Sequence, residues 1–168
     1  MSKLTNYYFK QSLRKFGDAY IKELALQLLK AKKKDTGTLI ASLNYKLLET
    51  LNEITLAIVS APYLNAVDKG RRPGAFVPPE VLAKWAQRKR LSLTYRGLKY
   101  KSYKEVGFAI HFKIKKEGIK PTNVLEKTRI AVFNNKVLID KLTQGGLLDL
   151  DDLIKRTFQN LNDTQKLK

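Results

Sequence analysis

The stretch that decides the fold runs from residue 35 to residue 74. It reads Asp35-Thr36-Gly37-Thr38-Leu39, then Ser42-Leu43-Asn44-Tyr45, Ala61-Pro62-Tyr63, Val67-Asp68-Lys69-Gly70 and Arg72-Pro73-Gly74. Two runs inside it alternate apolar and polar residues, with Leu43, Tyr45 and Leu47 in the first and Ile54, Leu56 and Ile58 in the second. Such alternation is typical of strands with one buried face. A short polar link at 49–53 separates the runs, so the sequence predicts an antiparallel hairpin.

Length and composition favour one domain with a real core. The chain has 168 residues, of which 43% are hydrophobic, and this is enough for a single domain over 1–168. We expect a core over about 4–144, a C-terminal helix at 147–161 and a frayed tail at 162–168. The formal net charge of +18, from 33 Lys and Arg against 15 Asp and Glu, favours a polyanion or an acidic protein face as a neighbour.

Several classes of protein are disfavoured by what the sequence lacks. It has no cysteine, which excludes disulfides and thiolate metal sites. No apolar run reaches the roughly 18 residues that a membrane span needs, and no signal peptide follows Lys3. We therefore expect a protein made in a cytoplasm, or carried in something assembled there, with no membrane partner.

Upstream of the central stretch, residues 4–33 predict one long amphipathic helix. Its apolar stripe consists of Phe9, Leu13, Phe16, Tyr20, Leu24 and Leu28. Gly17 is a weak point where the helix could bend. The cationic run Lys30–Lys34 suits the negative end of the helix dipole, and Asp35-Thr36-Gly37 is interpreted as the helix stop. An aspartic-protease reading of this Asp-Thr-Gly triplet is disfavoured, because no second copy exists and the triplet follows a helix end.

Downstream, prolines and glycines divide the chain into short elements. The expected elements are a short helix started by Pro62 and ended by Gly70, a helix at Glu80–Arg90 opened by Pro79, an exposed excursion at 91–104, an element at 105–117, another at 124–133, a flexible joint at Gly145-Gly146 and the final helix. Residues 105–117 fit both a strand and a helix, and the stop at Gly118 favours helix. For 124–133 the two alternatives stay open.

Catalysis finds little support in the residue types. His111 is the only histidine, and it is best explained as a side chain at the edge of an element. Asp149, Asp151 and Asp152 are close in sequence, but we expect them on different faces of a helix start, where carboxylates favourably meet the dipole. No glycine-rich phosphate loop is present. The sequence therefore predicts no enzyme, no cofactor and no metal.

Nucleic-acid contact has better support. Between Lys84 and Lys120 there are 12 Lys and Arg against Glu105 and Glu117, a net charge of +10. Tyr95, Tyr100 and Tyr103 are interleaved with them and could stack on bases. The candidate DNA-facing residues are Lys84, Arg88, Lys89, Arg90, Arg96, Lys99 and Lys101. Because no recognition motif is readable, the predicted contact is with the phosphate backbone and independent of base sequence.

The order and spacing of the central motifs resemble a known family. The residues that carry the resemblance are Asp35-Thr36-Gly37-Thr38-Leu39, Ser42-Leu43, Tyr45, Ala61-Pro62-Tyr63, Val67, Gly70, Pro73-Gly74, Pro78-Pro79, the Leu82–Trp85 helix and Ile114-Lys115-Lys116-Glu117-Gly118-Ile119-Lys120-Pro121. This pattern resembles tailed-bacteriophage tail-completion proteins, also called neck, head-tail joining or minor tail-component proteins. The match covers roughly residues 15–130.

The resemblance implies a structural role and a fold. It implies an α+β fold with a long N-terminal helix packed on a small antiparallel sheet, further helices and an extended loop excursion. It also implies no catalysis, and a virion protein assembled in the host cytoplasm as a homo-oligomeric ring of six or twelve copies around the DNA channel. The expected neighbours are portal or adaptor proteins, tail proteins and nonspecific DNA. The alternative is a stand-alone, basic, sequence-nonspecific nucleic-acid-binding protein.

The resemblance also assigns roles to individual positions. Residues interpreted as shaping turns and sheet edges are Asp35, Thr36, Gly37, Ser42, Tyr45, Pro62, Tyr63, Gly70, Pro73 and Gly74. Loop 71–79 and the excursion 91–104 are long and exposed, which is typical of functional loops. From them we expect subunit contacts through Arg71, Arg72, Phe76, Tyr95, Tyr100 and Tyr103. The excursion and the strong positive charge are departures from the short members of the family.

Overall fold

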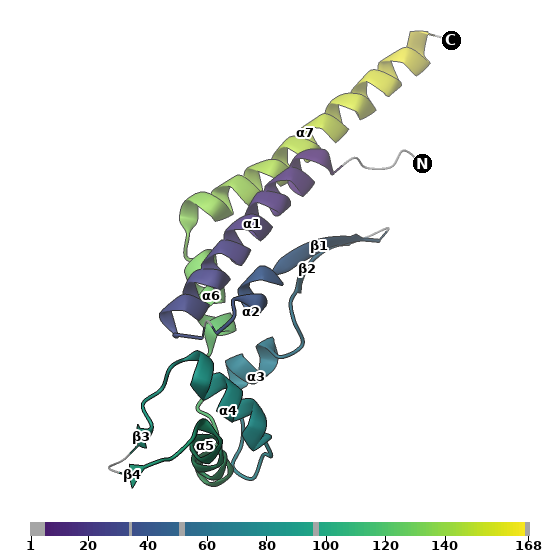
Figure 1. Ribbon diagram of the computed structural model, residues 1–168. Coiled ribbons are helices and arrows are strands. Elements are labelled where there is room, and N and C mark those ends of the chain that lie inside the picture. Colours follow the sequence, from purple (N-terminus) through teal and green to yellow (C-terminus); the bar gives the residue numbers. More distant parts are fainter. Residues whose placement is uncertain (1–5, 34, 51–52, 96–97, 167–168) are drawn as a thin grey trace. The chain divides into compact units, whose positions relative to one another are not determined.

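The computed structural model describes residues 6–33, 35–50, 53–95 and 98–166. In chain order these residues form α1 (Tyr7–Lys30), α2 (Thr38–Ala41), β1 (Asn44–Glu49), β2 (Ile54–Val59), α3 (Leu64–Lys69), α4 (Pro79–Arg88), β3 (Thr94–Tyr95), β4 (Leu98–Lys99), α5 (Tyr103–Glu117), α6 (Val124–Phe133) and α7 (Lys136–Lys166) (Figure 1). The structure combines helices with sheet, and it has a long N-terminal helix and a two-stranded antiparallel sheet. This confirms the predicted α+β class.

The chain divides into two compact units. Unit 1 comprises Met1–Gln27, Leu43–Val59 and Leu125–Lys168, and unit 2 comprises Leu28–Ser42 and Ser60–Val124. Each unit is assembled from segments that are distant in sequence, so neither corresponds to one continuous piece of chain. The prediction of a single domain over 1–168 stays a prediction.

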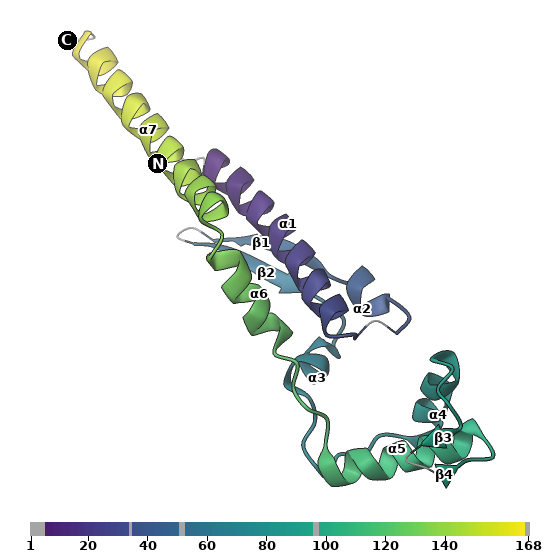
Figure 2. The ribbon, with the colours of Figure 1, turned by 90° about the vertical axis from the view of Figure 1, so that its left-hand side faces the viewer.

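Helix α1 is the element of unit 1 that the others contact. Its predicted stripe is largely confirmed, because Leu13, Phe16 and Leu24 are buried. Phe16 meets Phe133 of α6 edge to face, with ring centroids 5.5 Å apart. Figures 1 and 2 both show α7 running alongside α1. The start and end of α1, at Tyr7 and Lys30, lie a few residues inside the expected range of 4–33.

The β1–β2 hairpin has the predicted antiparallel pairing and packs on α1. Tyr45 pairs with Ile58, and Leu47 pairs with Leu56; all four are partly buried. Gly17, where the sequence allowed a bend, lies within the continuous helix α1. A Cβ at Gly17 would lie 3.0 Å from Leu56 Cδ1 and 3.0 Å from ring carbons of Tyr45. Gly17 therefore lets the strand side chains approach the helix closely.

The C-terminal end of α1 differs from the expectation. The amide of Lys33 donates to the Leu28 carbonyl at 3.0 Å, and that of Lys32 donates to Leu29 at 2.9 Å. Lys32 has φ 54, so this paired bonding is a Schellman motif with lysine in the left-handed position. The helix stop thus precedes the Asp35-Thr36-Gly37 triplet. Gly37, with φ 88, instead leads into α2.

Helix α7 corrects three expectations. Gly145-Gly146 is not a joint, because both residues lie within the continuous helix. Gly145 is buried against α1, and a Cβ at this position would lie 2.5 Å from Ser12 Oγ. The helix begins at Lys136 and reaches Lys166, so it exceeds 147–161 and includes most of the tail expected to fray. Residues 167–168 lie outside the described residues. Residues 124–133, left open between helix and strand, form helix α6.

In unit 2, α4 and α5 pack against each other (Figure 2). The favoured helix at 105–117 is confirmed as α5, whose Ser102 N-cap accepts from the Glu105 amide and whose end is followed by Gly118 with φ 73. Gly107 is buried, and a Cβ there would lie 2.5 Å from the Pro79 carbonyl oxygen. Because Gly107 has no side chain, α4 can approach α5 closely at this point.

The remaining elements of unit 2 need smaller corrections. Pro79 opens α4 as predicted, but α4 ends at Arg88, and Arg90 follows in a left-handed conformation with φ 49. The excursion at 91–104 is not wholly irregular, because it contains the short β3–β4 ladder and the first residues of α5. The short helix α3 is followed by Gly70, as predicted, and starts at Leu64, two residues after Pro62. Within the described chain, no helix combines the length and apolarity that crossing a membrane requires.

Candidate functional site

Two chain segments in unit 2 pair with each other in opposite directions and form what we name the clasp (residues 67–74 with 115–123). Arg71 and Ile119 exchange both backbone hydrogen bonds, at 2.9 and 2.8 Å. The Gly74 amide donates to the Lys115 carbonyl at 2.7 Å. The Asp68 carbonyl accepts from the amides of Thr122 (2.8 Å) and Asn123 (3.1 Å), and the Thr122 hydroxyl donates to Val67 at 2.7 Å. These bonds join the two ends of the segment that contains α4 and α5.

Two glycines make this close pairing geometrically possible. Gly70 has φ 69 and Gly118 has φ 73, in the left-handed region that L side chains rarely adopt. A Cβ at Gly70 would overlap the Ile119 carbonyl oxygen, and one at Gly118 would overlap the Arg71 carbonyl oxygen. Each glycine therefore accommodates the backbone of the opposite segment. Arg72, Pro73 and Gly74 complete the exposed turn of the clasp.

An exposed aromatic patch (Phe76, Phe108 and Phe112) lies beside the clasp. Phe76 is 69% exposed and Phe112 is 63% exposed. Their rings meet that of the buried His111 edge to face, at centroid distances of 5.2 and 5.5 Å. The His111 Nδ1 lies 2.7 Å from the Val77 carbonyl oxygen, which fixes the ring between them. Phe76 was predicted as a contact residue, whereas Phe108 and Phe112 were missed; their i, i+4 spacing on a helix is the signal that could have found them.

The positive charge of the chain is concentrated in unit 2. By sequence, unit 2 contains 19 Lys and Arg against five Asp and Glu, a net charge of +14. Unit 1 contains 14 against ten, a net charge of +4. The predicted basic segment 84–120 lies entirely within unit 2.

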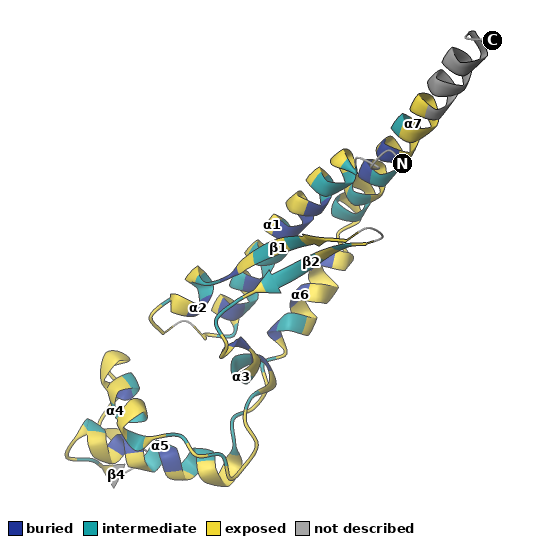
Figure 3. Ribbon diagram, turned by 90° about the vertical axis from the view of Figure 1, so that its right-hand side faces the viewer, coloured by how far each residue is buried: buried dark blue, intermediate teal, exposed yellow. Residues whose placement is uncertain are grey.

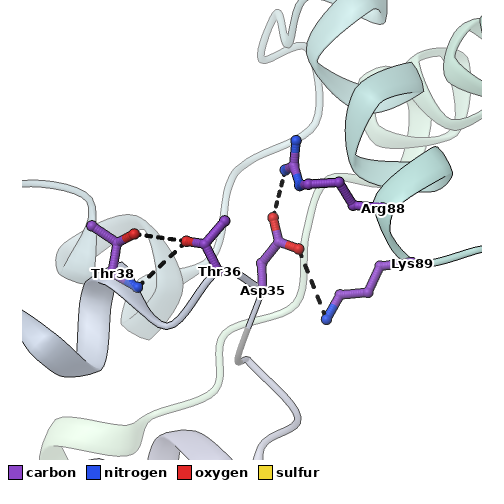
Figure 4. A network of polar contacts seen from close by, with 5 residues as sticks. All are labelled: Asp35, Thr36, Thr38, Arg88 and Lys89. Carbon is purple, nitrogen blue, oxygen red and sulfur yellow. Dashed lines mark hydrogen bonds and ion pairs between the residues drawn. The ribbon is translucent and has the colours of Figure 1, made fainter.

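Two of the candidate DNA-facing residues are partly neutralised. Arg88 Nη2 lies 2.6 Å from Asp35 Oδ2, and Lys89 Nζ lies 3.9 Å from Asp35 Oδ1 (Figure 4). The Thr36 hydroxyl lies beside this pair and bonds that of Thr38 at 2.7 Å. The other described candidates, Lys84, Arg90, Lys99 and Lys101, are exposed, and Arg96 lies outside the described residues.

The expected tyrosine contacts are spread over the β3–β4 region. Tyr95 belongs to β3, but its side chain lies outside the described residues. The Tyr100 amide donates to the Leu93 carbonyl at 2.7 Å, and Tyr103 is the first residue of α5; both side chains are partly buried. Phe76 thus contacts His111 of α5. Among the described residues, no ring contact between Phe76 and these tyrosines is observed.

The turn-shaping residues are divided between the units. In unit 2, Ser42 Oγ donates to the Leu39 carbonyl at 2.8 Å and accepts from the Ala61 amide at 2.9 Å, which joins two parts of the motif. Pro62 and Tyr63 are exposed just before α3. Tyr45 belongs to unit 1, where burial, together with the neighbouring Asp18 carboxylate, raises the pKa of its phenol.

Among the described residues, the acidic side chains and His111 do not form a metal-binding cluster. Over the described ranges, no three His, Cys, Asp or Glu side chains gather closely enough to hold a metal ion. Asp149 is buried inside α7 rather than at a helix start, and its carboxylate accepts from the amides of Tyr8 (3.0 Å) and Phe9 (2.8 Å). Its partner is therefore the positive end of α1, which is a structural contact.

No protein-family description, no curated protein and no solved structure matches this chain.

Proposed function

We propose that this chain is a structural virion protein of a tailed phage, which forms a homo-oligomeric ring in the head-tail connector around the DNA channel. The observation that carries the proposal is the clasp. Among the residues that carry the resemblance to tail-completion proteins are Gly70 and Pro73-Gly74 in one part of the chain and Ile114–Pro121 in another. In the clasp these stretches bond to each other through backbone groups, and a glycine from each accommodates the other.

Two further features support a role in assembly. The fold has the long helix and antiparallel hairpin that the resemblance implies. The aromatic patch exposes large rings next to a rigid backbone pairing, and exposed apolar groups on a fixed frame are typical of protein contact surfaces. The neighbours proposed for this ring are portal or adaptor proteins, tail proteins and the DNA inside the channel.

The second candidate is a stand-alone, sequence-nonspecific nucleic-acid-binding protein. The charge of unit 2 favours it, because a net charge of +14 on fewer than half of the residues attracts phosphate without any base recognition. The same charge suits a ring around a DNA channel. For this reason charge alone does not separate the two candidates.

Native mass spectrometry on nuclease-treated protein separates them. The protein would be measured with and without duplex DNA across a salt series. A discrete ring in the absence of DNA is the expected result. A monomer that binds DNA, with an affinity that falls steeply with salt, would overturn the proposal in favour of the second candidate.

A further inference from the structure

Two helices, α1 and α4, end within unit 2 in clusters of basic residues. We name the two clusters together the basic junction. Its members are Lys30, Lys32, Lys33, Arg88, Lys89 and Arg90. All six are exposed, as the yellow ends of these helices in Figure 3 illustrate.

Both helix ends hold a cation in a fixed backbone conformation. The end of α4 repeats the Schellman bonding of α1, because the Arg90 amide donates to the Gln87 carbonyl at 2.9 Å and the Leu91 amide donates to Ala86 at 3.0 Å. Arg90, with φ 49, and Lys32, with φ 54, occupy the left-handed position that is usually glycine. Each helix end therefore accepts backbone strain at a position where it keeps a positive charge.

Asp35 joins the two clusters. Its carboxylate oxygens lie 2.6 Å from Arg88 Nη2 and 3.9 Å from Lys89 Nζ (Figure 4). Its Cα follows that of Lys33 by two residues, which is a separation of at most about 8 Å. One carboxylate of the first segment thus neutralises part of the charge of the second.

The basic junction keeps an excess of positive charge after this pairing. Residues 28–42 and 79–90 together contain eight Lys and Arg against Asp35 and Glu80, a net charge of +6. Glu80 lies in the first turn of α4, at the opposite end of that helix from the junction. Among the described residues, Lys32 and Arg90 take part in no ion pair. Exposed cations that the protein itself does not neutralise are the groups that bind a polyanion.

We propose that the basic junction binds the phosphate backbone of duplex DNA and that Asp35 occupies the position of a phosphate in the free chain, an inference that rests on the DNA contact of the proposed function. Carboxylate and phosphate both accept charge-assisted hydrogen bonds from a guanidinium, so one can replace the other beside Arg88. DNA suits the junction better than a small anion does, because its successive phosphates can contact both clusters at once. Asp35 is thus an internal competitor that weakens binding until DNA displaces it.

Removing the internal competitor is the first test. Fluorescence anisotropy with a short labelled duplex would measure the affinity of the nuclease-treated, full-length protein across a salt series. Asp35→Asn should bind roughly tenfold more tightly at about 0.1 M salt, which is the contribution of one phosphate contact. Glu117→Gln is the matched control, because it removes an exposed carboxylate of unit 2 that pairs with Lys113 at 4.0 Å, and it should have a much smaller effect. In an Arg88→Gln background, the gain from Asp35→Asn should disappear.

Removing the cations at the two helix ends is the second test. Lys32→Gly and Arg90→Gly delete a positive charge where the left-handed backbone favours glycine, so a loss of binding would not come from unfolding. Each should weaken binding roughly tenfold at about 0.1 M salt and reduce the slope of log affinity against log salt concentration by about one. Lys141→Gln, on the exposed part of α7 in unit 1, should leave both quantities unchanged. Circular dichroism would verify that each variant is folded.

Other results would overturn the inference. A gain from Asp35→Asn no larger than that from Glu117→Gln would show that Asp35 does not compete with phosphate. Unchanged binding by both glycine variants would place the DNA contact elsewhere. Displacement of the duplex by inorganic phosphate at an equal concentration of phosphate groups would make the junction a small-anion site.

This inference and the proposed function can fail separately. A ring by native mass whose DNA affinity does not depend on the junction would retain the proposed function and reject this site. A protein that binds DNA through the junction, with the expected response to Asp35→Asn, but never forms a ring would retain the site and reject the ring.

Discussion

Both units use glycine for close packing, Gly107 of unit 2 included, but they differ in how their distant segments are joined. Unit 1 depends on side chains and small residues that fit between elements, as at Gly17 under the hairpin and Gly145 beside Ser12. The clasp of unit 2 depends on backbone bonds between distant segments, and this unit carries most of the net charge. Backbone pairing leaves side chains available for other contacts. The comparison indicates that unit 1 provides a packed frame, whereas unit 2 presents basic and aromatic groups.

The largest expected effect concerns the clasp. Gly70→Ala would place a methyl group onto the Ile119 carbonyl and force a left-handed alanine. We expect a loss of roughly 3 kcal/mol or more in the free energy of unfolding of unit 2. Trp85 is the only tryptophan and belongs to α4, so its fluorescence during urea unfolding reports on unit 2.

Gly74→Ala is the control for this prediction. Gly74 also has a positive φ, of 86, but no atom lies within 4 Å of the position of its Cβ. Only the left-handed penalty of about 1 kcal/mol should apply. Equal losses for the two variants would show that close backbone approach does not stabilise unit 2, and the contrast between the units would fail.

In unit 1 the largest expected effect concerns a carboxylate that bonds helix amides. Asp149→Ala would leave the amides of Tyr8 and Phe9 without their acceptor at the start of α1. We expect a loss of about 1–3 kcal/mol, because these donors are partly buried. Faster amide hydrogen exchange at Tyr8 and Phe9 would locate the effect.

Asp151→Ala is the matched substitution on the same helix. It removes an exposed i, i+4 ion pair with Lys155, and such pairs contribute little. A loss equal to that of Asp149→Ala would mean that charge on α7, rather than the amide bonds, stabilises α1.

The sequence predicted well those elements whose signals are local. The hairpin followed from period-two alternation in residues 43–58, and the start of α4 followed from Pro79. The helix at 105–117 was correctly favoured because Gly118 marks its end. In each case, the deciding residues lie within or next to the element that they define.

The errors share a physical cause, which is that the deciding partner lies far away in the sequence. Gly145 was interpreted as a joint because glycine weakens isolated helices, but its neighbour is Ser12. The backbone bridge between Arg71 and Ile119 and the ion pair between Asp35 and Arg88 cannot be deduced from the local sequence pattern. At the candidate site, Phe76 was found through its loop, whereas Phe108 and Phe112 required knowledge of which face of α5 is exposed.

The glycine pair in α7 tests the packing of unit 1 against intrinsic helix propensity. Gly145→Ala should lose about 1–3 kcal/mol, because a Cβ would lie 2.8 Å from the Tyr8 carbonyl oxygen and 2.5 Å from Ser12 Oγ. At Gly146 the nearest atom, Phe9 Cδ2, is 3.8 Å away, so Gly146→Ala should gain roughly 0.5–1 kcal/mol from helix propensity. Urea unfolding followed by circular dichroism measures both. Stabilisation by both substitutions would indicate that α7 does not pack closely on α1.

The smallest effect concerns the titration of Tyr45 in unit 1. Burial contributes more to the raised pKa of this phenol than the neighbouring charges do. Burial raises the pKa of the phenol, the Asp18 carboxylate raises it further, and Arg14 opposes them. A raised pKa favours the neutral phenol in the folded state. Its contribution to stability is therefore full below the ordinary value near 10.0 and is lost as the pH rises through the folded pKa.

Subtracting the ultraviolet absorbance titration of Tyr45→Phe from that of the natural protein isolates this phenol among eight tyrosines. We expect the difference curve to have its midpoint above 10.0. Asp18→Asn should lower the pKa only partly, because burial is the larger cause. A full return to the ordinary value would instead make the Asp18 charge, and not burial, the main cause of the raised pKa.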